Sequence, residues 1–152
     1  MILGIDPGPE TLAAVLYGSG KVTIIGDMSP EQLFATAIPA GCVAIEDFVT
    51  YQPVAAESRE TIKQIGVLRW VFSNRGHKVV EIPRAVILRH VMGDTRGGDT
   101  VLRAAITDRF GGSRRAAWGV KAEPGPLYGL TGSHLLAALA VAITAEETTE
   151  KP

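Results

Sequence analysis

Apolar residues recur along the chain in two patterns, one typical of buried strands and the other of helices. Compact apolar runs predict five strands, at residues 2–6, 11–17, 21–25, 42–45 and 78–82. Apolar positions three and four apart predict helices at 30–38, 58–74, 84–92, 100–110 and 134–146. Three strands followed by alternating helices and strands indicate an α/β fold, in which helices cover both faces of a five-stranded mixed sheet.

Turn and capping residues set the boundaries of these elements. A Gly-Ser-Gly sequence at residues 18–20 predicts a tight hairpin between two strands. Ser29, directly before a proline, is typical of a helix start because its hydroxyl accepts hydrogen bonds from free amide groups. The Gly-rich and Pro-rich residues 113–132 are predicted to be irregular. Because no repeat or linker divides the chain, we expect one domain over residues 1–147 and a flexible tail over 148–152.

The composition is that of an ordinary globular protein. Of the 152 residues, 46% are hydrophobic and 20% are charged. No apolar run approaches the roughly 18 residues of a membrane span, and the N-terminus lacks the basic start of a signal peptide. We therefore expect a cytoplasmic protein without membrane contact.

The net charge of −1 conceals an uneven distribution of charged residues. Residues 59–121 hold thirteen Lys and Arg against five Asp and Glu. A basic surface attracts phosphate backbones, and the sequence-independent part of nucleic-acid binding is built from such charges. Solvated helix faces would account for the same residues, so charge alone leaves nucleic-acid binding open.

Two acidic residues at strand ends give the sharpest chemical signal. Asp6 ends the first predicted strand, and Glu46 follows the fourth. If these strands are neighbours, both carboxylates project from one edge of the sheet into one crevice. Close carboxylates repel unless a proton or a cation lies between them, and oxygen ligands suit Mg²⁺ or Mn²⁺. Either acid alone would equally serve as a cap, but the pair favours a metal site.

Four segments form a pattern that spans nearly the whole chain. Residues 2–8 read Ile-Leu-Gly-Ile-Asp-Pro-Gly, and residues 43–47 read Val-Ala-Ile-Glu-Asp. Together they resemble the two catalytic strands of the RuvC family of Holliday junction resolvases. Residues 82–93 are similar to that family's passage into a Gly-rich DNA-contacting loop, and residues 134–143 to its last helix. The short length and the departures from the cellular pattern favour a phage or prophage branch, and with it the cytosol of a bacterial host.

The resemblance implies an RNase H-like nuclease that uses Mg²⁺, with Mn²⁺ as the alternative, to hydrolyse branched DNA as a homodimer. Asp6, Glu46 and His134 would be its catalytic residues and its metal ligands, and Asp47, next to Glu46, is a further candidate ligand. An imidazole at His134 would bind the metal or transfer protons; the alternative is a helix-start histidine bonded to backbone. The predicted helix from Ser58 to Asn74 resembles the one across which family members dimerise.

One position in the last helix departs from the family pattern. The family usually places a second metal-binding acid three residues after the position of His134, where this chain has Ala137. A methyl group cannot bind a cation, so the ligand position is vacant. An Asp→Ala substitution introduced to trap the nuclease on DNA would explain it, as would a protein that binds junctions without cutting them. A third explanation is natural recruitment of another acid, such as Asp47, Asp94 or Asp99.

Basic and aromatic residues are the candidates for DNA contact. Asp99 lies about where cellular family members often have a lysine, so the contact there is expected to differ. Phe48 and Tyr51, shortly after Glu46, would stack on an unpaired base or else anchor the core. The basic candidates are Arg89, Arg96, Arg103, Arg114, Arg115 and Lys121. Ordinary exposed helix charge is the alternative for the first three of them.

Two functions besides junction resolution stay open on the sequence. One is a protein of the same fold that binds branched DNA without cleaving it. The other is a RuvC-fold nuclease that acts on other branched DNA or on RNA. A panel of branched substrates would separate these alternatives.

Overall fold

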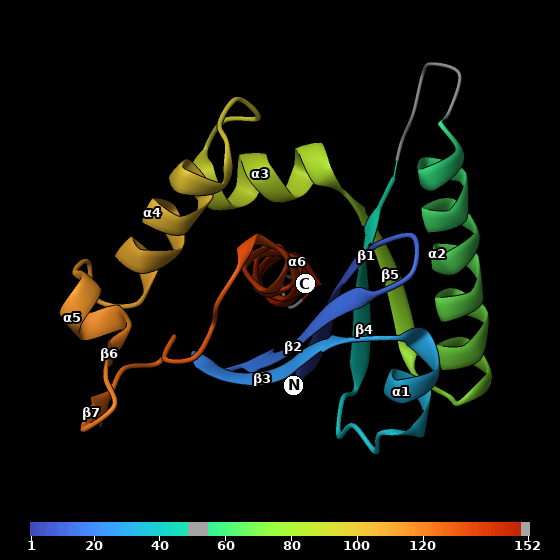
Figure 1. Ribbon diagram of the computed structural model, residues 1–152, viewed down its shortest axis with the longest axis horizontal. Helices are drawn as coiled ribbons and strands as arrows, with labels where there is room; N and C mark the ends of the chain where they lie inside the picture. Colours follow the sequence, from blue (N-terminus) through green and yellow to red (C-terminus); the bar gives the residue numbers. More distant parts are fainter. Residues whose placement is uncertain (49–54, 150–152) are drawn as a thin grey trace.

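The computed structural model describes residues 1–48 and 55–149, and its elements follow the predicted order (Figure 1). The main strands are β1 (Ile2–Pro7), β2 (Leu12–Gly18), β3 (Lys21–Met28), β4 (Cys42–Asp47) and β5 (Lys78–Pro83). The helices are α1 (Pro30–Ala35), α2 (Ala56–Asn74), α3 (Arg84–Met92), α4 (Asp99–Arg109), α5 (Arg114–Ala117) and α6 (Ser133–Thr149). Two short strands, β6 (Gly119–Val120) and β7 (Glu123–Pro124), pair with each other.

The five main strands form one mixed sheet in the order β3-β2-β1-β4-β5, which confirms the predicted fold class. Strand β2 runs antiparallel to β1 and β3, whereas β4 lies parallel to both β1 and β5. Helix α6 covers one face together with α3 and α4, and α1 and α2 cover the other (Figure 1). Because β1 and β4 are parallel neighbours, their C-terminal ends meet at one edge of the sheet, as the pairing of Asp6 with Glu46 requires.

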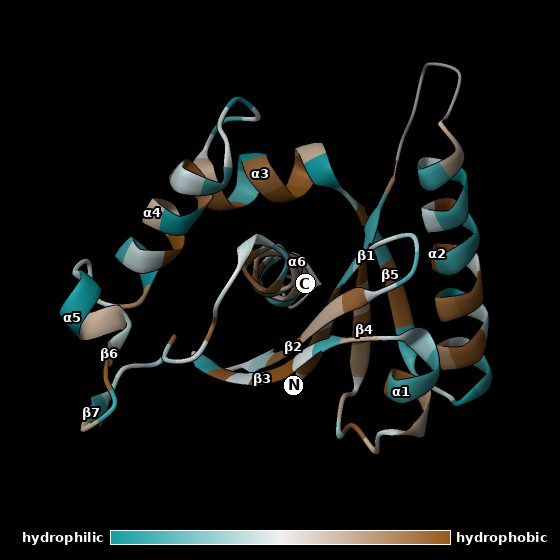
Figure 2. Ribbon diagram, in the orientation of Figure 1, coloured by the Kyte–Doolittle hydropathy of each residue, from teal (hydrophilic) through white to brown (hydrophobic). Residues whose placement is uncertain are grey.

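Helix α6 lies against the centre of the sheet because it is apolar nearly all round. Its residues from Leu135 to Ala145 are all buried, and Figure 2 shows hydrophobic residues gathered on the helices and strands about it. Gly4 of β1 faces this helix, and a Cβ added there would lie 2.8 Å from the Cβ of Ala142. Only glycine permits so close an approach. Even so, none of the helices in residues 1–48 and 55–149 combines the length and apolarity needed to cross a membrane.

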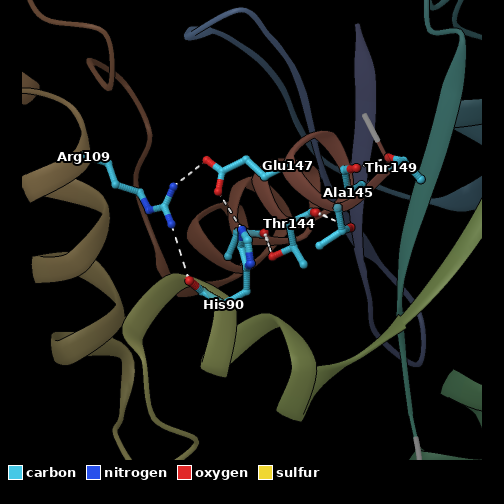
Figure 3. A network of polar contacts seen from close by, with 8 residues as sticks. His90, Arg109, Thr144, Ala145, Glu147 and Thr149 are labelled. Carbon is cyan, nitrogen blue, oxygen red and sulfur yellow. Dashed lines mark hydrogen bonds and ion pairs between the residues drawn. The ribbon is translucent and has the colours of Figure 1, made fainter. Parts of the chain in front are cut away.

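A cluster of polar side chains fastens the outer helices to α6 (Figure 3). His90 of α3 places Nε2 at 2.6 Å from Oε2 of Glu147, and Arg109 of α4 donates through Nη1 to Oε1 at 2.6 Å. Arg109 also donates to the carbonyl oxygen of His90 at 3.4 Å. Burial raises the pKa of Glu147, but the hydrogen bonds with His90 and Arg109 outweigh it, so that the pKa is lowered on balance. The cluster thus holds α3 and α4 in place beside the sheet.

Several boundaries differ from the sequence-based prediction. Helix α1 ends at Ala35 rather than near residue 38, because Thr36 is extended and its amide donates to Leu33. Residues 113–132, predicted to be irregular, contain α5 and the β6-β7 pair. The short helix forms because the Ser113 side chain accepts a hydrogen bond from the Ala116 amide. Helix α6 continues past residue 146 to Thr149, and residues 150–152 lie outside the described part of the chain.

Candidate functional site

The register of the parallel strands places the two predicted carboxylates side by side. Ile5 of β1 pairs with Ile45 of β4, so Asp6 and Glu46 are the next residues on the two adjoining strands. Neighbouring strands lie roughly 5 Å apart, which is therefore the expected separation of the two backbones at these residues. Each carboxylate side chain is only 12% exposed. Burial raises the pKa of Glu46, and the charge of Asp6 raises it further. The two acids therefore repel each other within one partly buried site.

His134, at the start of α6, contacts Asp6. Its Nδ1 lies 2.8 Å from Oδ2 of Asp6, while the imidazole is 78% exposed. The hydrogen bond to Asp6 raises the pKa of His134. Burial nevertheless raises the pKa of Asp6, with His134 opposing the rise. The close packing of α6 on Gly4 sets this geometry, because it fixes the height of the helix above β1.

Arg84 is a residue of the site that the sequence analysis missed. Its Nη1 donates to both oxygens of Glu46, at 3.0 Å and 3.3 Å. Arg84 opens α3 directly after β5, and β5 pairs with β4 so that Ile82 lies opposite Glu46. The signal was available, since Arg84 follows the third parallel strand end just as Glu46 follows the second. A cation thus stands at the same edge of the sheet as the carboxylates.

These residues line a cleft of about 620 Å³, which we call the carboxylate cleft. Asp47 and Phe48 also line it, as predicted, and Phe48 is 43% exposed. Ala137, one turn beyond His134, is buried and is not among the lining residues. The full lining comprises Asp6, Pro7, Gly8, Pro9, Glu46, Asp47, Phe48, Thr61, Pro83, Arg84, Ala85 and His134.

Asp27 of β3 is a second residue that the sequence analysis missed. In the sheet, Asp6 pairs with Ala13 and Ala13 pairs with Asp27, so both acids point to the same face. A register shift in the β2-β3 pair at Ala14/Val15 produces this arrangement, because one extra residue moves a side chain to the other face. Asp27 also lines a smaller recess of about 230 Å³ together with Asp6 and His134.

The acids considered as replacements for the residue missing at 137 lie in different surroundings. Asp47 lines the carboxylate cleft. Asp99 begins α4 and interacts electrostatically with Arg84 and His134. Asp94 is bound within its own loop, where it accepts a hydrogen bond from the Arg96 amide at 3.1 Å. Only Asp47 and Asp99 are therefore placed to influence the cleft.

The basic candidates are spread over the helices beyond α6. Arg89 is exposed on α3, and Lys121 is exposed between β6 and β7. Arg96 pairs with Asp94, and Arg115 lies 3.7 Å from Glu123. Arg103 and Arg114 line a separate recess beside Trp118. Tyr51 lies outside the described residues.

The donor groups fit a single hard cation better than a pair of cations. Within residues 1–48 and 55–149, no group of three or more His, Cys, Asp or Glu side chains is arranged to hold a metal ion. Two neighbouring carboxylates are nevertheless sufficient for Mg²⁺, which usually keeps several waters and binds proteins through one or two carboxylates. Repulsion between Asp6 and Glu46 would be relieved by such a cation.

Comparison with known proteins places the fold. No protein-family model matches the chain, and no curated protein matches its sequence. Among solved structures, Thermus thermophilus RuvC in complex with a Holliday junction substrate matches at 19% identity and a TM-score of 0.65, covering 97% of this chain and 93% of that one. A second T. thermophilus RuvC structure matches at 19% identity and a TM-score of 0.63, covering 97% and 94%. Fowlpox virus resolvase with Holliday junction DNA matches at 14% identity and a TM-score of 0.51, covering 97% and 99%.

These neighbours confirm the resemblance that residues 2–8 and 43–47 indicated. The likeness extends over 97% of the chain. Because the sequence identity is only 19%, the likeness concerns the fold alone. The chain thus has the RNase H-like fold of the RuvC Holliday junction resolvases.

Proposed function

We propose that the chain is a metal-dependent nuclease that resolves Holliday junctions or related branched DNA. The single observation that supports this most strongly is the placement of Asp6 and Glu46 directly after the last residue pair of two adjoining strands, in a cleft of about 620 Å³. The structural neighbours include a RuvC and a poxvirus resolvase in complex with junction DNA. Carboxylates paired in a cleft have no role in packing the core, so a role in chemistry accounts for them best.

Asp6 and Glu46 are the residues we propose as ligands of Mg²⁺ or Mn²⁺. A bound cation of this kind supplies Lewis-acid stabilisation of the scissile phosphate and lowers the pKa of its bound water. His134 then orients Asp6 from outside the set of metal ligands, because its Nδ1 lies 2.8 Å from Oδ2 of Asp6. Such outer hydrogen bonds orient metal-binding groups. Asp47 and Asp99 are candidates for completing the set.

The side chains of the cleft also have roles of their own. With Nδ1 held by Asp6, the other ring nitrogen of His134 is left to accept or donate a proton in a largely exposed imidazole. Arg84 binds Glu46 through Nη1, and its remaining N–H groups are suited to a phosphate oxygen of the strand in the cleft. Phe48 offers an exposed ring for stacking at the branch point.

A homodimer formed through α2 belongs to the same proposal. The outer surface of this helix exposes Ile62 at 39%, Val67 at 49% and Trp70 at 69%. Exposed apolar groups clustered on one element are typical of an interaction surface. A four-way junction has two-fold symmetry, so a symmetric dimer would present two clefts to two opposed strands.

Ala137 favours a second candidate function, in which the chain binds branched DNA without cutting it. The vacant ligand position and the absence of a three-residue metal group in the described chain both point to weak cation binding. Arg84 and His134, already bonded to the two carboxylates, would further compete with a cation. This alternative keeps the fold and the DNA partner but removes the reaction.

A substrate panel tests the proposed function. Four-way junctions, three-way junctions, flaps, RNA hybrids and plain duplex are each incubated with the chain and with Ala137→Asp, in Mg²⁺, in Mn²⁺ and in EDTA. Cleavage of the four-way junction by the chain in a divalent cation supports the nuclease proposal. Junction binding without cleavage by either protein supports the non-cleaving alternative, and cleavage by Ala137→Asp alone identifies a site inactivated at position 137. A preference for flaps or RNA hybrids would overturn the assignment of substrate.

A further inference from the structure

A second recess, separate from the carboxylate cleft, lies between α4, α5 and the segment that leads into α6. Its volume is about 470 Å³, and it is lined by Arg103, Thr107, Arg114, Trp118 and Tyr128 with two glycines. None of these residues lines the carboxylate cleft. We call it the arginine recess. Its lining includes no acidic residue.

The guanidinium of Arg103 is held in a fixed position in the arginine recess. It lies over the ring of Trp118, with the guanidinium carbon 4.7 Å from the ring centroid. The ring is itself fixed, because Trp118 donates through Nε1 to Oγ1 of Thr107 at 3.0 Å. A cation stacked on an aromatic face keeps its N–H groups free at its edge. Arg103 is thus preorganised to bind an anion.

The charge of the recess is uncompensated. In the described part of the chain, Arg109 binds Glu147, Arg96 binds Asp94 and Arg115 approaches Glu123, but neither Arg103 nor Arg114 forms an ion pair with a carboxylate. Two arginines without a carboxylate partner in one recess favour the binding of an anion there. Tyr128, which is 45% exposed, adds a hydroxyl donor to the same lining. Guanidinium and hydroxyl donors together suit a phosphate group.

We propose that the arginine recess binds a backbone phosphate of a DNA arm, at a distance from the phosphate in the carboxylate cleft. The identity of the ligand as DNA rests on the proposed function. Tyr128 precedes His134 by six residues, which span at most about 22 Å of extended chain. Allowing for side chains, the contacted phosphate lies within about one helical turn of the duplex, roughly 34 Å, from the cleaved one. The recess thus fixes the arm relative to the cleft.

The test measures binding in EDTA, where no cleavage occurs. Dissociation constants for a four-way junction and for plain duplex are obtained by fluorescence anisotropy with the unaltered chain, Arg103→Gln, Arg114→Gln and Arg103→Lys. Lys78→Gln is the matched control, because Lys78 starts β5 at the opposite edge of the sheet from the carboxylates. Loss of one phosphate contact weakens binding about eightfold at 0.1 M salt and reduces the salt slope by about one. We expect this for each Gln variant and not for the control.

Single neutral methylphosphonates placed along one arm locate the contact. At one position within about ten nucleotides of the cleaved phosphate, neutralisation should weaken binding by the unaltered chain but not by Arg103→Gln. Equal losses in both proteins at every position would overturn the proposal, as would unchanged binding by both Gln variants. Full rescue by Arg103→Lys would show that charge alone matters and would overturn the role of the Trp118 stack. If the chain binds duplex as tightly as junction, the proposed function fails, while the duplex data still decide the recess.

Discussion

Replacing Gly4 with alanine should separate α6 from the sheet and so displace His134 from Asp6. The added Cβ would lie 2.8 Å from the Cβ of Ala142, and the carbonyl oxygen of Ala138 lies nearer still. Carbon atoms in contact are about 3.5–4.0 Å apart, so the helix must withdraw by about 1 Å. The obstruction is helix backbone, which has no other rotamer to adopt.

The displacement has a cost in stability and a cost in function. Overpacking a core costs about 1–3 kcal/mol, and a backbone obstruction places Gly4→Ala near the upper end of that range. For a chain of 152 residues this lowers Tm by roughly 6–12 °C. The 2.8 Å contact between His134 and Asp6 would lengthen beyond hydrogen-bonding distance. A misplacement of about 1 Å reduces a catalytic rate by roughly a hundredfold.

Urea denaturation and cleavage of a four-way junction measure the two effects. Gly41→Ala is the control, because a Cβ at Gly41 would meet no atom within 4 Å. The control should match the unaltered chain in both assays. Unchanged stability of Gly4→Ala would refute the close packing of α6 on β1. A destabilised Gly4→Ala with full activity would refute the dependence of the site on that packing.

Three further changes test other parts of the structure. Glu147→Gln should lower the free energy of unfolding by about 1 kcal/mol at pH 7, a figure reduced for solvent exposure. Because the pKa of Glu147 is lowered in the fold, the difference from the unaltered chain should begin to shrink as the pH falls below about 4.3, the ordinary pKa of Glu, and should disappear once the carboxyl is protonated in the folded state as well. A difference that does not shrink in acid urea titrations would contradict the ion-pair account. Trp70→Asp should convert a dimer to a monomer in sedimentation velocity. The control Val120→Asp, which also changes an exposed apolar residue, should leave the dimer intact. If the unaltered chain is itself a monomer, the α2 interface is excluded. Phe48→Ala should weaken junction binding by about 1–3 kcal/mol without changing Tm, and unchanged affinity would remove the stacking role.

The fold and the central acids could be predicted from the sequence because both depend on local patterns. Asp6 and Glu46 each end a compact apolar run, and parallel strands necessarily bring their C-terminal ends together. The apolar composition of α6 likewise predicted a buried helix. In such cases the side-chain pattern alone determines the environment.

The remaining parts of the site depend on register and long-range packing. Asp27 reaches the face of Asp6 only because the β2-β3 register shifts near Ala14, which no hydrophobic pattern reveals. The position of Arg84 after a strand end is visible in the sequence, but its contact with Glu46 requires that β5 lie beside β4, and the chain order does not fix that neighbour relation. Residues 113–132 fold as short elements because Leu127 and Leu130 are buried in the core, which a Gly-rich and Pro-rich sequence obscures.

The central claim is that Asp6 acts with Glu46 in metal-dependent cleavage of branched DNA. The most direct measurement compares the unaltered chain with Asp6→Asn on a four-way junction, recording cleavage in Mg²⁺ or Mn²⁺ and binding in EDTA. We predict that the chain nicks the junction in the divalent cation, that Asp6→Asn is at least about a hundredfold slower, and that both bind it equally. Cleavage by Asp6→Asn at the rate of the unaltered chain, or cleavage by the chain in EDTA, would contradict the account.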